Sequence, residues 1–403
     1  MRMVENCVLT GLTMISVGFV QVWVASVVLT LAQPALAFPD HLRVRLFESH
    51  QPISRIYVNA PFVLSGSRQA FRHGSYCFTA TNHGVFLSCA ADAHLNLNAA
   101  RFTLVSEDRG VAVGYANGRE RHYLGLINIE SASPSESGSA GVSPASDHSL
   151  SIVNEVDARH YVESVVGSET LPAFPAEMLK AQAVLTATKI FLAPAYATIS
   201  DSTQDQAYLG ADYVRPSVKA AVAAVWGQFL YYKKDPVQVY FHSTCGGKTS
   251  SAISVFGDAA RNMPYLKCVP CDFCRQSPFY KTTKSSVPTL LFHSTFGDLP
   301  QVNKYDCAQR PELLTLRKNG KQSDMSGYQF WIAVGQKFGW DKLPGTRFKL
   351  SATDRLVKLE STGAGHGVGL CQWGAAGMAR QGKSYQEILQ YYYPGTTVAA
   401  HHI

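Results

Sequence analysis

The spacing of apolar residues changes along this chain, and this change limits its fold more than any other feature. In residues 41–129, short runs such as 43–47 (Arg-Val-Arg-Leu-Phe) alternate polar and apolar side chains between glycine or polar breaks. Alternation with a period of two predicts β-strands. In residues 175–192, Leu179, Ala183 and Ile190 recur at helical spacing instead. No regular strand-helix-strand rhythm follows, so the sequence predicts an α+β fold.

Turn signals and proline positions predict several further elements. A second helix is expected over Pro216–Val225, followed by a hairpin of residues 228–232 and 237–241. A helix is expected around residues 375–381 and a last one over 385–393. In the β-rich part, Cys77 and Cys89 flank an Asn-His-Gly turn at 82–84. They form either a disulfide across a hairpin or two buried free thiols.

The first 37 residues have the layout of a secretory signal. Arg2 precedes an apolar run from 7 to 31, and Ala35-Leu36-Ala37 forms an A-x-A cleavage site. The run is also long enough to cross a bilayer as an uncleaved anchor. Both alternatives predict an exported protein of the periplasm, the cell wall or the outer face of the cytoplasmic membrane. Membrane contact is expected only through an uncleaved N-terminal segment.

Composition divides the remaining chain into three parts. Residues 38–130 form the β-rich region, residues 131–149 contain mainly Ser, Ala, Gly and Pro, and residues 150–398 mix helices and strands. The middle part has few large side chains to offset the entropy of ordering it, so we predict a flexible insertion. The net charge of +7 is spread along the chain and suits an anionic partner without identifying one.

Four ordered segments between residues 154 and 398 resemble one known family. The first leads from a Ser168-Glu169 loop, through an aromatic residue and proline, into the Glu-x-Leu-Lys-Ala-Gln-Ala-Val helix start at 177–184. The others are Gln-x-Tyr-x-Gly at 206–210, a His-Ser-x-x-Gly-Gly loop at 242–247 and the glycine-rich segment 365–374. Together these segments resemble the stage II sporulation protein D and amidase-enhancer family.

The resemblance implies a lytic transglycosylase with Glu169 as its only catalytic acid. Such an enzyme cleaves the bond between N-acetylmuramic acid and N-acetylglucosamine, prefers strands without stem peptides, and leaves 1,6-anhydro ends. One carboxyl group suffices, because it protonates the leaving oxygen and then accepts the proton of the sugar's 6-hydroxyl. An apolar setting would raise its pKa and keep it protonated. Alternatively, Glu169 is a solvated loop acid or a helix cap. Glu177 is the competing acid, but its simplest role near a helix N-terminus is to complement the helix dipole.

Other residues at matching family positions are expected to bind the glycan. These predicted substrate-binding residues are Lys180, Gln182, Tyr208, Ser243, His366 and Gln372. Alternatively, Lys180 is a surface lysine, Gln182 a buried amide, His366 a structural histidine and Tyr208 a core residue.

The chain departs from the family pattern close to the predicted acid. Thr170-Leu171 replaces the family's Met-Pro, and Ala187 replaces its helix arginine. A second interpretation therefore stays open, in which the protein binds peptidoglycan and stimulates an N-acetylmuramoyl-L-alanine amidase without cutting glycan. The expected partners are peptidoglycan glycan strands and, in the second interpretation, a cell-wall amidase.

A cysteine cluster predicts a metal site. Cys268-x-x-Cys271-x-x-Cys274 follows His242 and Cys245, which gives five ligands where tetrahedral zinc needs four. The preferred set is the four cysteines, with His242 as the substitute. Four protein ligands leave no open position, so zinc would be structural and no cofactor would be needed for the chemistry. Two disulfides are the alternative outside the cytoplasm.

A zinc-ribbon module for nucleic acid is a third interpretation of the same cysteines. The export signal and the lack of a concentrated basic stripe argue against it. No nucleic-acid partner is expected.

Overall fold

A computed structural model describes most of the chain after residue 37. The described residues are 38–50, 52–66, 70–89, 92–106, 110–115, 119–132, 148–194, 197–203 and 205–400, with four two-residue strands nearer the N-terminus. Those strands are β1 (Leu12–Thr13), β2 (Ser16–Val17), β3 (Val20–Gln21) and β4 (Val24–Ala25), paired β1 with β4 and β2 with β3. The predicted export segment and residues 133–147 of the predicted insertion otherwise lie outside the described residues. Among the described helices, none has the length and apolar character that a membrane crossing requires.

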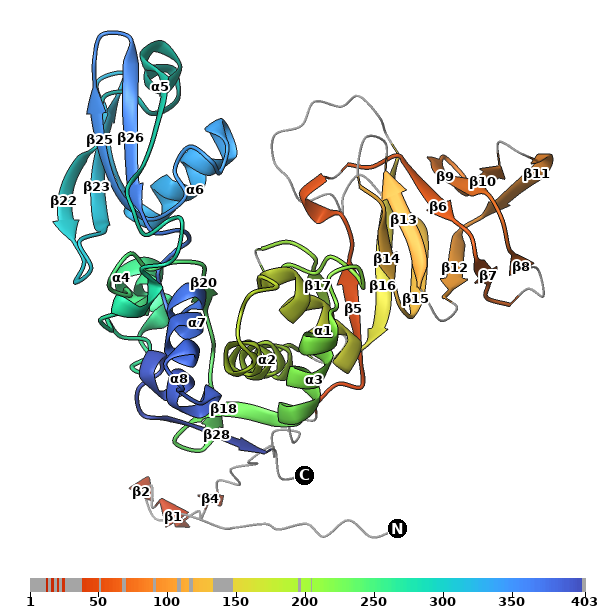
Figure 1. Ribbon diagram of the computed structural model, residues 1–403, viewed down its shortest axis with the longest axis horizontal. Coiled ribbons are helices and arrows are strands. Elements are labelled where there is room, and N and C mark those ends of the chain that lie inside the picture. The colour runs from red at the N-terminus through yellow and green to blue at the C-terminus, as the bar shows by residue number, and fades with distance from the viewer. Residues whose placement is uncertain are drawn as a thin grey trace. The chain divides into compact units, whose positions relative to one another are not determined.

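The unit that begins at Phe38 starts with two antiparallel sheets (Figure 1). The six-stranded sheet runs, in spatial order, through β11 (Asp92–Ala99), β10 (Gly84–Cys89), β9 (Ser75–Thr81), β6 (Arg55–Asn59), β13 (Val111–Tyr115) and β14 (Arg121–Tyr123). The seven-stranded sheet runs through β17 (Thr198–Ser200), β5 (His41–Arg45), β16 (Ser149–Asp157), β15 (Leu126–Ala132), β12 (Arg101–Val105), β7 (Phe62–Leu64) and β8 (Ala70–Phe71). Among the described strands of these two sheets, β17 and β5 are the one pair that runs in parallel.

Apolar residues on alternate positions hold these sheets together. Along β9 and β10 every second residue is buried, including Phe78, Val85 and Leu87. Strands β9 and β10 contact β15 and β12 of the other sheet, so the apolar faces pack on each other. The register places Cys77 opposite Ser88 and Cys89 opposite Tyr76. The two cysteines therefore point to opposite faces and remain free thiols, which excludes the disulfide alternative.

Strand β16 joins the β-rich region to the helices. It lies between β5 and β15 and continues into α1 (Ala158–Glu169), whose N-cap Asp157 accepts hydrogen bonds from the amides of Arg159 and His160. The predicted boundary at residue 150 thus falls inside a strand of the N-terminal sheet. One continuous hydrophobic core extends from Leu42 to Tyr393.

The helical region confirms most of the predicted elements. Its helices are α1, α2 (Ala176–Phe191), α3 (Pro216–Val225), α4 (Ala252–Phe256), α7 (Gln372–Arg380) and α8 (Tyr385–Tyr392), with short 3-10 helices η2 (Gly257–Ala260) and η3 (Asp272–Cys274). Its strands are β18 (Gln228–Tyr232), β19 (Asp235–Pro236), β28 (Thr396–Ala400), and the parallel pair β20 (Phe241–His242) and β27 (Leu370–Cys371). The predicted hairpin is only partly correct. Strand β18 pairs with the two residues of β19 on one side and along its whole length with β28 on the other.

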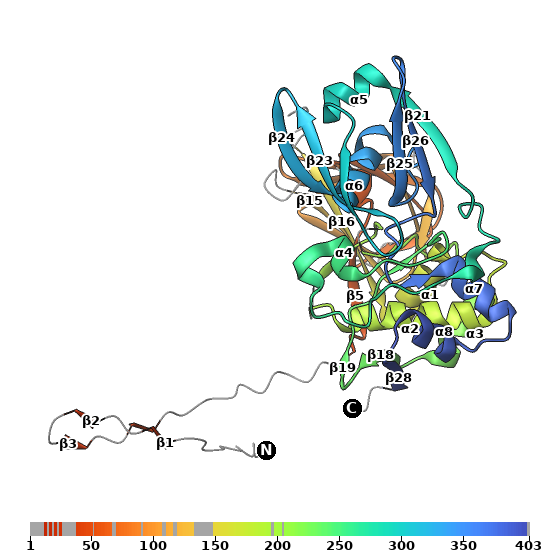
Figure 2. The same ribbon diagram turned by 90° about the vertical axis from the view of Figure 1, so that its left-hand side faces the viewer.

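Residues 283–362 form a lobe that the sequence did not predict. It contains β21 (Thr283–Pro288), α5 (Thr289–Phe296), β22 (Gln301–Tyr305), β23 (Pro311–Lys318), β24 (Lys321–Ser326), α6 (Gly327–Phe338), β25 (Arg347–Ala352) and β26 (Leu356–Thr362), shown in Figure 2. The lobe has its own hydrophobic core, in which Phe292, Phe330 and Val357 are fully buried. With strands and helices intermixed in this way, the predicted α+β class is confirmed.

A disulfide between Cys268 and Cys307 ties this lobe to the helical region, across a sequence separation of 39 residues. We expect the double variant Cys268→Ser/Cys307→Ser to lower the free energy of unfolding by about 2–5 kcal/mol, because the cross-link restricts the unfolded chain. Denaturant unfolding monitored by circular dichroism measures the change. Cys77→Ser, which removes a free thiol, is the control. An unchanged unfolding midpoint in the double variant would contradict the prediction.

Candidate active site and metal centre

Glu169 is the last residue of α1, and the chain turns to an extended conformation at Thr170. The helix is fixed in place by its buried residues Tyr161, Val162 and Val165. Glu169 itself is only partly buried. Its carboxylate is therefore held at the end of a rigid element, and the residue keeps part of its surface exposed.

Three of the predicted motifs converge on this glutamate. The amide of Ala207 donates a hydrogen bond to Glu169 Oε1 at 2.8 Å. Gln372 Nε2, at the start of α7, donates to the Glu169 carbonyl oxygen at 3.1 Å. The amide of Leu209 donates to the side chain of Ser168 at 3.3 Å. The Ser-Glu motif, which lies at the end of α1 rather than in the predicted loop, the Gln-x-Tyr-x-Gly turn and the glycine-rich segment thus form one site.

Burial raises the pKa of Glu169 above its ordinary value. The Ala207 amide, Gln372 and the positive charge of Lys189 act in the opposite direction, without cancelling the effect of burial. Glu177 behaves differently. Burial would raise its pKa too, but hydrogen bonds from Lys180 and from the amide of Tyr385 outweigh burial and lower it.

The structure decides the role of several predicted glycan contacts. Lys180 Nζ donates to Glu177 Oε1 at 2.6 Å, and its ammonium group lies over the ring of Tyr385. Gln182 is fully buried and accepts a hydrogen bond from Gln372 Nε2 at 3.4 Å. Gln182 is therefore the buried amide of the alternative interpretation, and its support for Gln372 is a positioning role.

Two further predicted contacts also have structural roles. Tyr208 is 1% exposed, its hydroxyl donates to Asn154 Oδ1, and its ring stacks on Tyr161. This is a core position, so we withdraw Tyr208 as a glycan contact. Ser243 is partly buried, and its hydroxyl oxygen lies 3.3 Å from that of Thr244.

Both ring nitrogens of His366 are bound to the backbone. Nδ1 accepts from the amide of Val368 at 3.1 Å, and Nε2 lies 2.9 Å from the carbonyl oxygen of Phe241. This requires a neutral ring with its proton on Nε2, and burial lowers the pKa of His366 to about 4. His366 is therefore the structural histidine of the alternative interpretation. The flanking glycines allow close approach of protein, since a Cβ at Gly365 or Gly367 would collide with His242 or Arg310.

Four cysteine sulfurs lie within 4.8 Å of one another, and all four side chains are fully buried. They belong to Cys245 after β20, Cys271 and Cys274 around η3, and Cys371 at the N-cap of α7. Cys245 Sγ and Cys274 Sγ are 3.6 Å apart. Tetrahedral zinc with Zn–S bonds of about 2.3 Å requires sulfur atoms about 3.8 Å apart. The four cysteines thus form a group that could hold a metal ion.

The predicted ligand set needs two corrections. Cys268 is bonded to Cys307 and is not available as a ligand, and Cys371 takes its place. His242 is not a member of the four-sulfur group; its Nδ1 lies 3.0 Å from the Val368 carbonyl oxygen, and its Nε2 is buried without a hydrogen-bond partner.

The surroundings of the four sulfurs shift their pKa values in different directions. Amides of Cys245 and Gly374 each donate to Cys371 Sγ at 3.3 Å. Hydrogen bonds with the neighbouring thiols lower the pKa of Cys274 and raise that of Cys245, and burial raises that of Cys371. From the lobe, the buried guanidinium of Arg310 donates to the Cys245 carbonyl oxygen at 2.6 Å. Such outer contacts orient ligands and offset the negative charge of bound thiolates.

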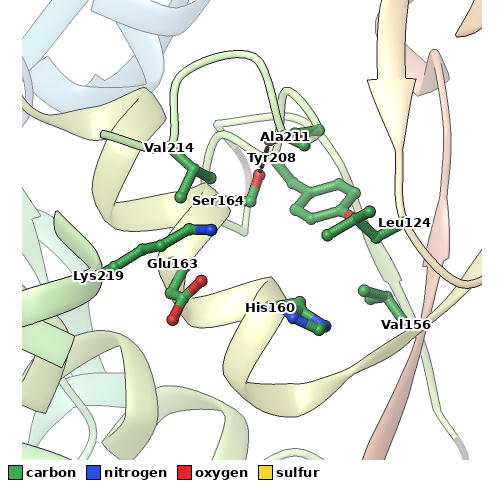
Figure 3. A pocket seen from close by; sticks show the side chains of 10 residues that line it. Leu124, Val156, His160, Glu163, Ser164, Tyr208, Ala211, Val214 and Lys219 are labelled. Carbon is green, nitrogen blue, oxygen red and sulfur yellow. Dashed lines mark hydrogen bonds between the residues drawn. The ribbon is translucent and has the colours of Figure 1, made fainter. Parts of the chain in front are cut away.

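Two cavities lie in the helical region, and Glu169 lines neither. The first, of about 140 Å³, is shown in Figure 3 with Glu163, Lys219 and His160 on its wall. Glu163 is a second buried carboxylate of α1, paired with Arg159 at 3.4 Å. The second cavity, of about 210 Å³, is lined by residues that include Lys189 of α2 and Gln206 of the loop that binds Glu169.

Comparisons with known proteins agree with this arrangement. Residues 146–232, which contain Glu169, match the family model described as stage II sporulation protein. The chain is 31% identical over 288 residues to stage II sporulation protein D of Bacillus amyloliquefaciens, covering 63% of this chain and 76% of that protein. The equivalent protein of Bacillus subtilis is 28% identical over 284 residues, covering 61% and 76%. A shorter match, 46% identical over 43 residues, is to the amidase enhancer of Bacillus subtilis, and covers 11% of this chain and 6% of that protein.

The matched region, the order of the motifs and their convergence on one glutamate lead to the same assignment. This chain belongs to the stage II sporulation protein D family.

Proposed function

We propose that the protein is an exported lytic transglycosylase that cleaves peptidoglycan glycan strands, in cell-wall remodelling or sporulation, with Glu169 as its single acid and base. The observation that carries the proposal is the raised pKa of a partly buried glutamate at which three family motifs meet. A raised pKa near the working pH is what a general acid needs.

The chemistry requires one proton to move twice. Protonated Glu169 gives its proton to the glycosidic oxygen between N-acetylmuramic acid and N-acetylglucosamine, and that C–O bond breaks. The resulting carboxylate accepts the proton of the muramic 6-hydroxyl, whose oxygen bonds to C1 and closes the 1,6-anhydro ring. The Ala207 amide stabilises the carboxylate stage, and Gln372 fixes the backbone that carries it.

We further propose that Cys245, Cys271, Cys274 and Cys371 hold a structural zinc ion. Their separation and burial fit a four-thiolate site, which leaves no open position for water. Zinc would join the loop after β20, the η3 segment and the start of α7. Because Cys371 precedes Gln372, this clamp would also keep Gln372 against Glu169.

A non-catalytic amidase enhancer is the second candidate, favoured by the short match to the amidase enhancer. The two candidates differ in their products. Purified stem-free glycan strands incubated with the protein should yield 1,6-anhydromuramyl ends, detected by mass spectrometry. The same strands with stem peptides and an added amidase test stimulation of peptide release. Stimulation of the amidase without formation of anhydro ends would show that the protein is an enhancer and not a transglycosylase.

The rate should fall with increasing pH on an alkaline limb set by Glu169. The general acid must be protonated, and the pKa of Glu169 is raised above its ordinary value of 4.5. Activity is therefore expected to persist above pH 4.5 and to decline as the pH passes through the raised pKa. Initial rates on stem-free glycan across a pH series measure the limb. A rate that is already lost at pH 4.5 would contradict the raised pKa.

A further inference from the structure

The cavity of about 210 Å³, here called the Lys189 cavity, lies next to the proposed acid. Its wall includes Tyr161 of α1, Lys189 and Ile190 of α2, and the loop residues Asp205 and Gln206. Gln206 directly precedes Ala207, whose amide binds Glu169. Glu169 does not line the cavity, but it acts electrostatically on Tyr161 and Lys189 of the wall, so the cavity lies close to the proposed acid.

Two buried polar atoms on the wall have no partner in hydrogen-bonding geometry. They are the hydroxyl oxygen of Tyr161 and Oε1 of Gln206, and their residues are 0% and 2% exposed. A buried polar group without a partner costs free energy, so such groups normally face water or a ligand. The side chains of Tyr161 and Gln206 lie close enough to act on each other, but neither of these two atoms makes a hydrogen bond of normal geometry, so a ligand in the cavity can supply one.

Lys189 adds a positive charge to the wall. Burial lowers the pKa of Lys189, whereas the nearby carboxylates of Asp205 and Glu169 raise it. Its ammonium group donates one hydrogen bond, to the backbone carbonyl oxygen of Asp205. An ammonium has three donors, and no ion pair with Lys189 is found within the described ranges. The Asp205 carboxylate instead accepts from the amide of Ser200 at 2.8 Å. Ile190, Pro194 and Ile199 add apolar surface to the wall.

We propose that the Lys189 cavity binds a small substituent with a carboxylate and an adjacent methyl group, the carboxylate lying against Lys189 and the methyl against the apolar surface. A dry cavity of about 150 Å³ accommodates benzene, which has six non-hydrogen atoms. The lactyl ether of N-acetylmuramic acid also has six. Resting on the proposed function, the ligand is then the free lactyl group of a muramic residue without a stem peptide.

This assignment gives a physical basis for selecting stem-free strands. Attachment of a stem peptide converts the lactyl carboxylate into a neutral amide and adds a chain that the cavity cannot contain. Both changes act next to Lys189. The ligand loses the carboxylate that pairs with the ammonium group, and its volume exceeds that of the cavity. Lys189 is thus a specificity residue, distinct from the acid that moves the proton.

Binding without turnover tests the proposal. In a Glu169→Gln background, isothermal titration calorimetry compares a stem-free tetrasaccharide of alternating N-acetylglucosamine and N-acetylmuramic acid with chitotetraose, which lacks lactyl groups. We expect the muramic tetrasaccharide to bind about 10-fold or more tightly than chitotetraose, as for a hydrogen bond to a charged group. Conversion of its carboxylates to methylamides should remove this preference.

Variants of Lys189 separate recognition from folding. Lys189→Met should bind the muramic tetrasaccharide and chitotetraose equally, with chitotetraose affinity unchanged, whereas Lys189→Arg should keep the preference. Lys219→Met, at a lysine that lines the other cavity, should behave as the parent. Equal binding of both sugars by the parent protein, or equal weakening of both by Lys189→Met, would overturn the proposal. Since binding is measured without cleavage, absent anhydro ends would reject the transglycosylase alone.

Discussion

Replacing Glu169 with glutamine is expected to lower the rate of anhydro-end formation on stem-free glycan by about 10²- to 10⁴-fold, the range typical for loss of a general acid. The amide cannot give a proton to the glycosidic oxygen. It can still accept the hydrogen bond from Ala207, so the loop around the site should be preserved. Initial rates of anhydro-end formation, quantified by mass spectrometry, measure the loss.

A matched control for this experiment is Glu163→Gln. Glu163 is a buried carboxylate on the same helix but is paired with Arg159, and it lines the cavity of about 140 Å³, which Glu169 does not line. Its replacement should change the rate by less than about 2-fold, since it takes no part in the proton transfer. Similar losses of rate in both variants would show that replacing either glutamate of α1 with glutamine impairs the protein. The loss in Glu169→Gln would then no longer support Glu169 as the acid.

Stability gives a second check on the same variant. The pKa of Glu169 is higher in the folded protein than its ordinary value, so the folded state binds this proton more tightly. The corresponding stability is present below pH 4.5 and is lost as the pH rises through the folded pKa. Glutamine has no such loss. Glu169→Gln should therefore be at least as stable as the wild type at neutral pH, which excludes misfolding as the cause of inactivity.

The sequence predicted the parts of the site that depend on local pattern. Residues 175–192 repeat apolar side chains at helical spacing, and α2 occupies Ala176–Phe191. The position of Glu169 before this helix followed from motif order. That its carboxylate meets the Ala207 amide did not, because such a contact depends on how the 201–209 loop folds back on α1.

Residues far apart in sequence explain the errors. Tyr208 matched a family position, but only the packing shows that its ring stacks on Tyr161 in the core. Likewise, the lobe at 283–362 separates Cys274 from Cys371, so spacing alone favoured the nearer Cys268. The C-x-x-C pattern correctly placed Cys271 and Cys274 together, since that spacing keeps two ligands within one turn.

Cys371→Ser is expected to remove the metal and to destabilise the protein by several kcal/mol. Structural zinc sites contribute on the order of 10 kcal/mol of binding free energy that is coupled to folding, and whole domains are stable by only about 5–15 kcal/mol. The wild type should contain about one zinc ion per chain, measured by plasma mass spectrometry, and the variant far less, with a lower unfolding temperature.

The double variant Cys268→Ser/Cys307→Ser separates the two cysteine arrangements. It lacks the disulfide but keeps all four sulfurs of the proposed centre, so its zinc content should equal that of the wild type. Zinc retained in Cys371→Ser and lost in the double variant would restore Cys268 as a ligand. Loss of zinc should also slow glycan cleavage, because α7 begins at the residue after Cys371 and its first side chain, Gln372, binds the Glu169 backbone. The metal centre would thus affect the reaction only by positioning Gln372 and, through it, Glu169.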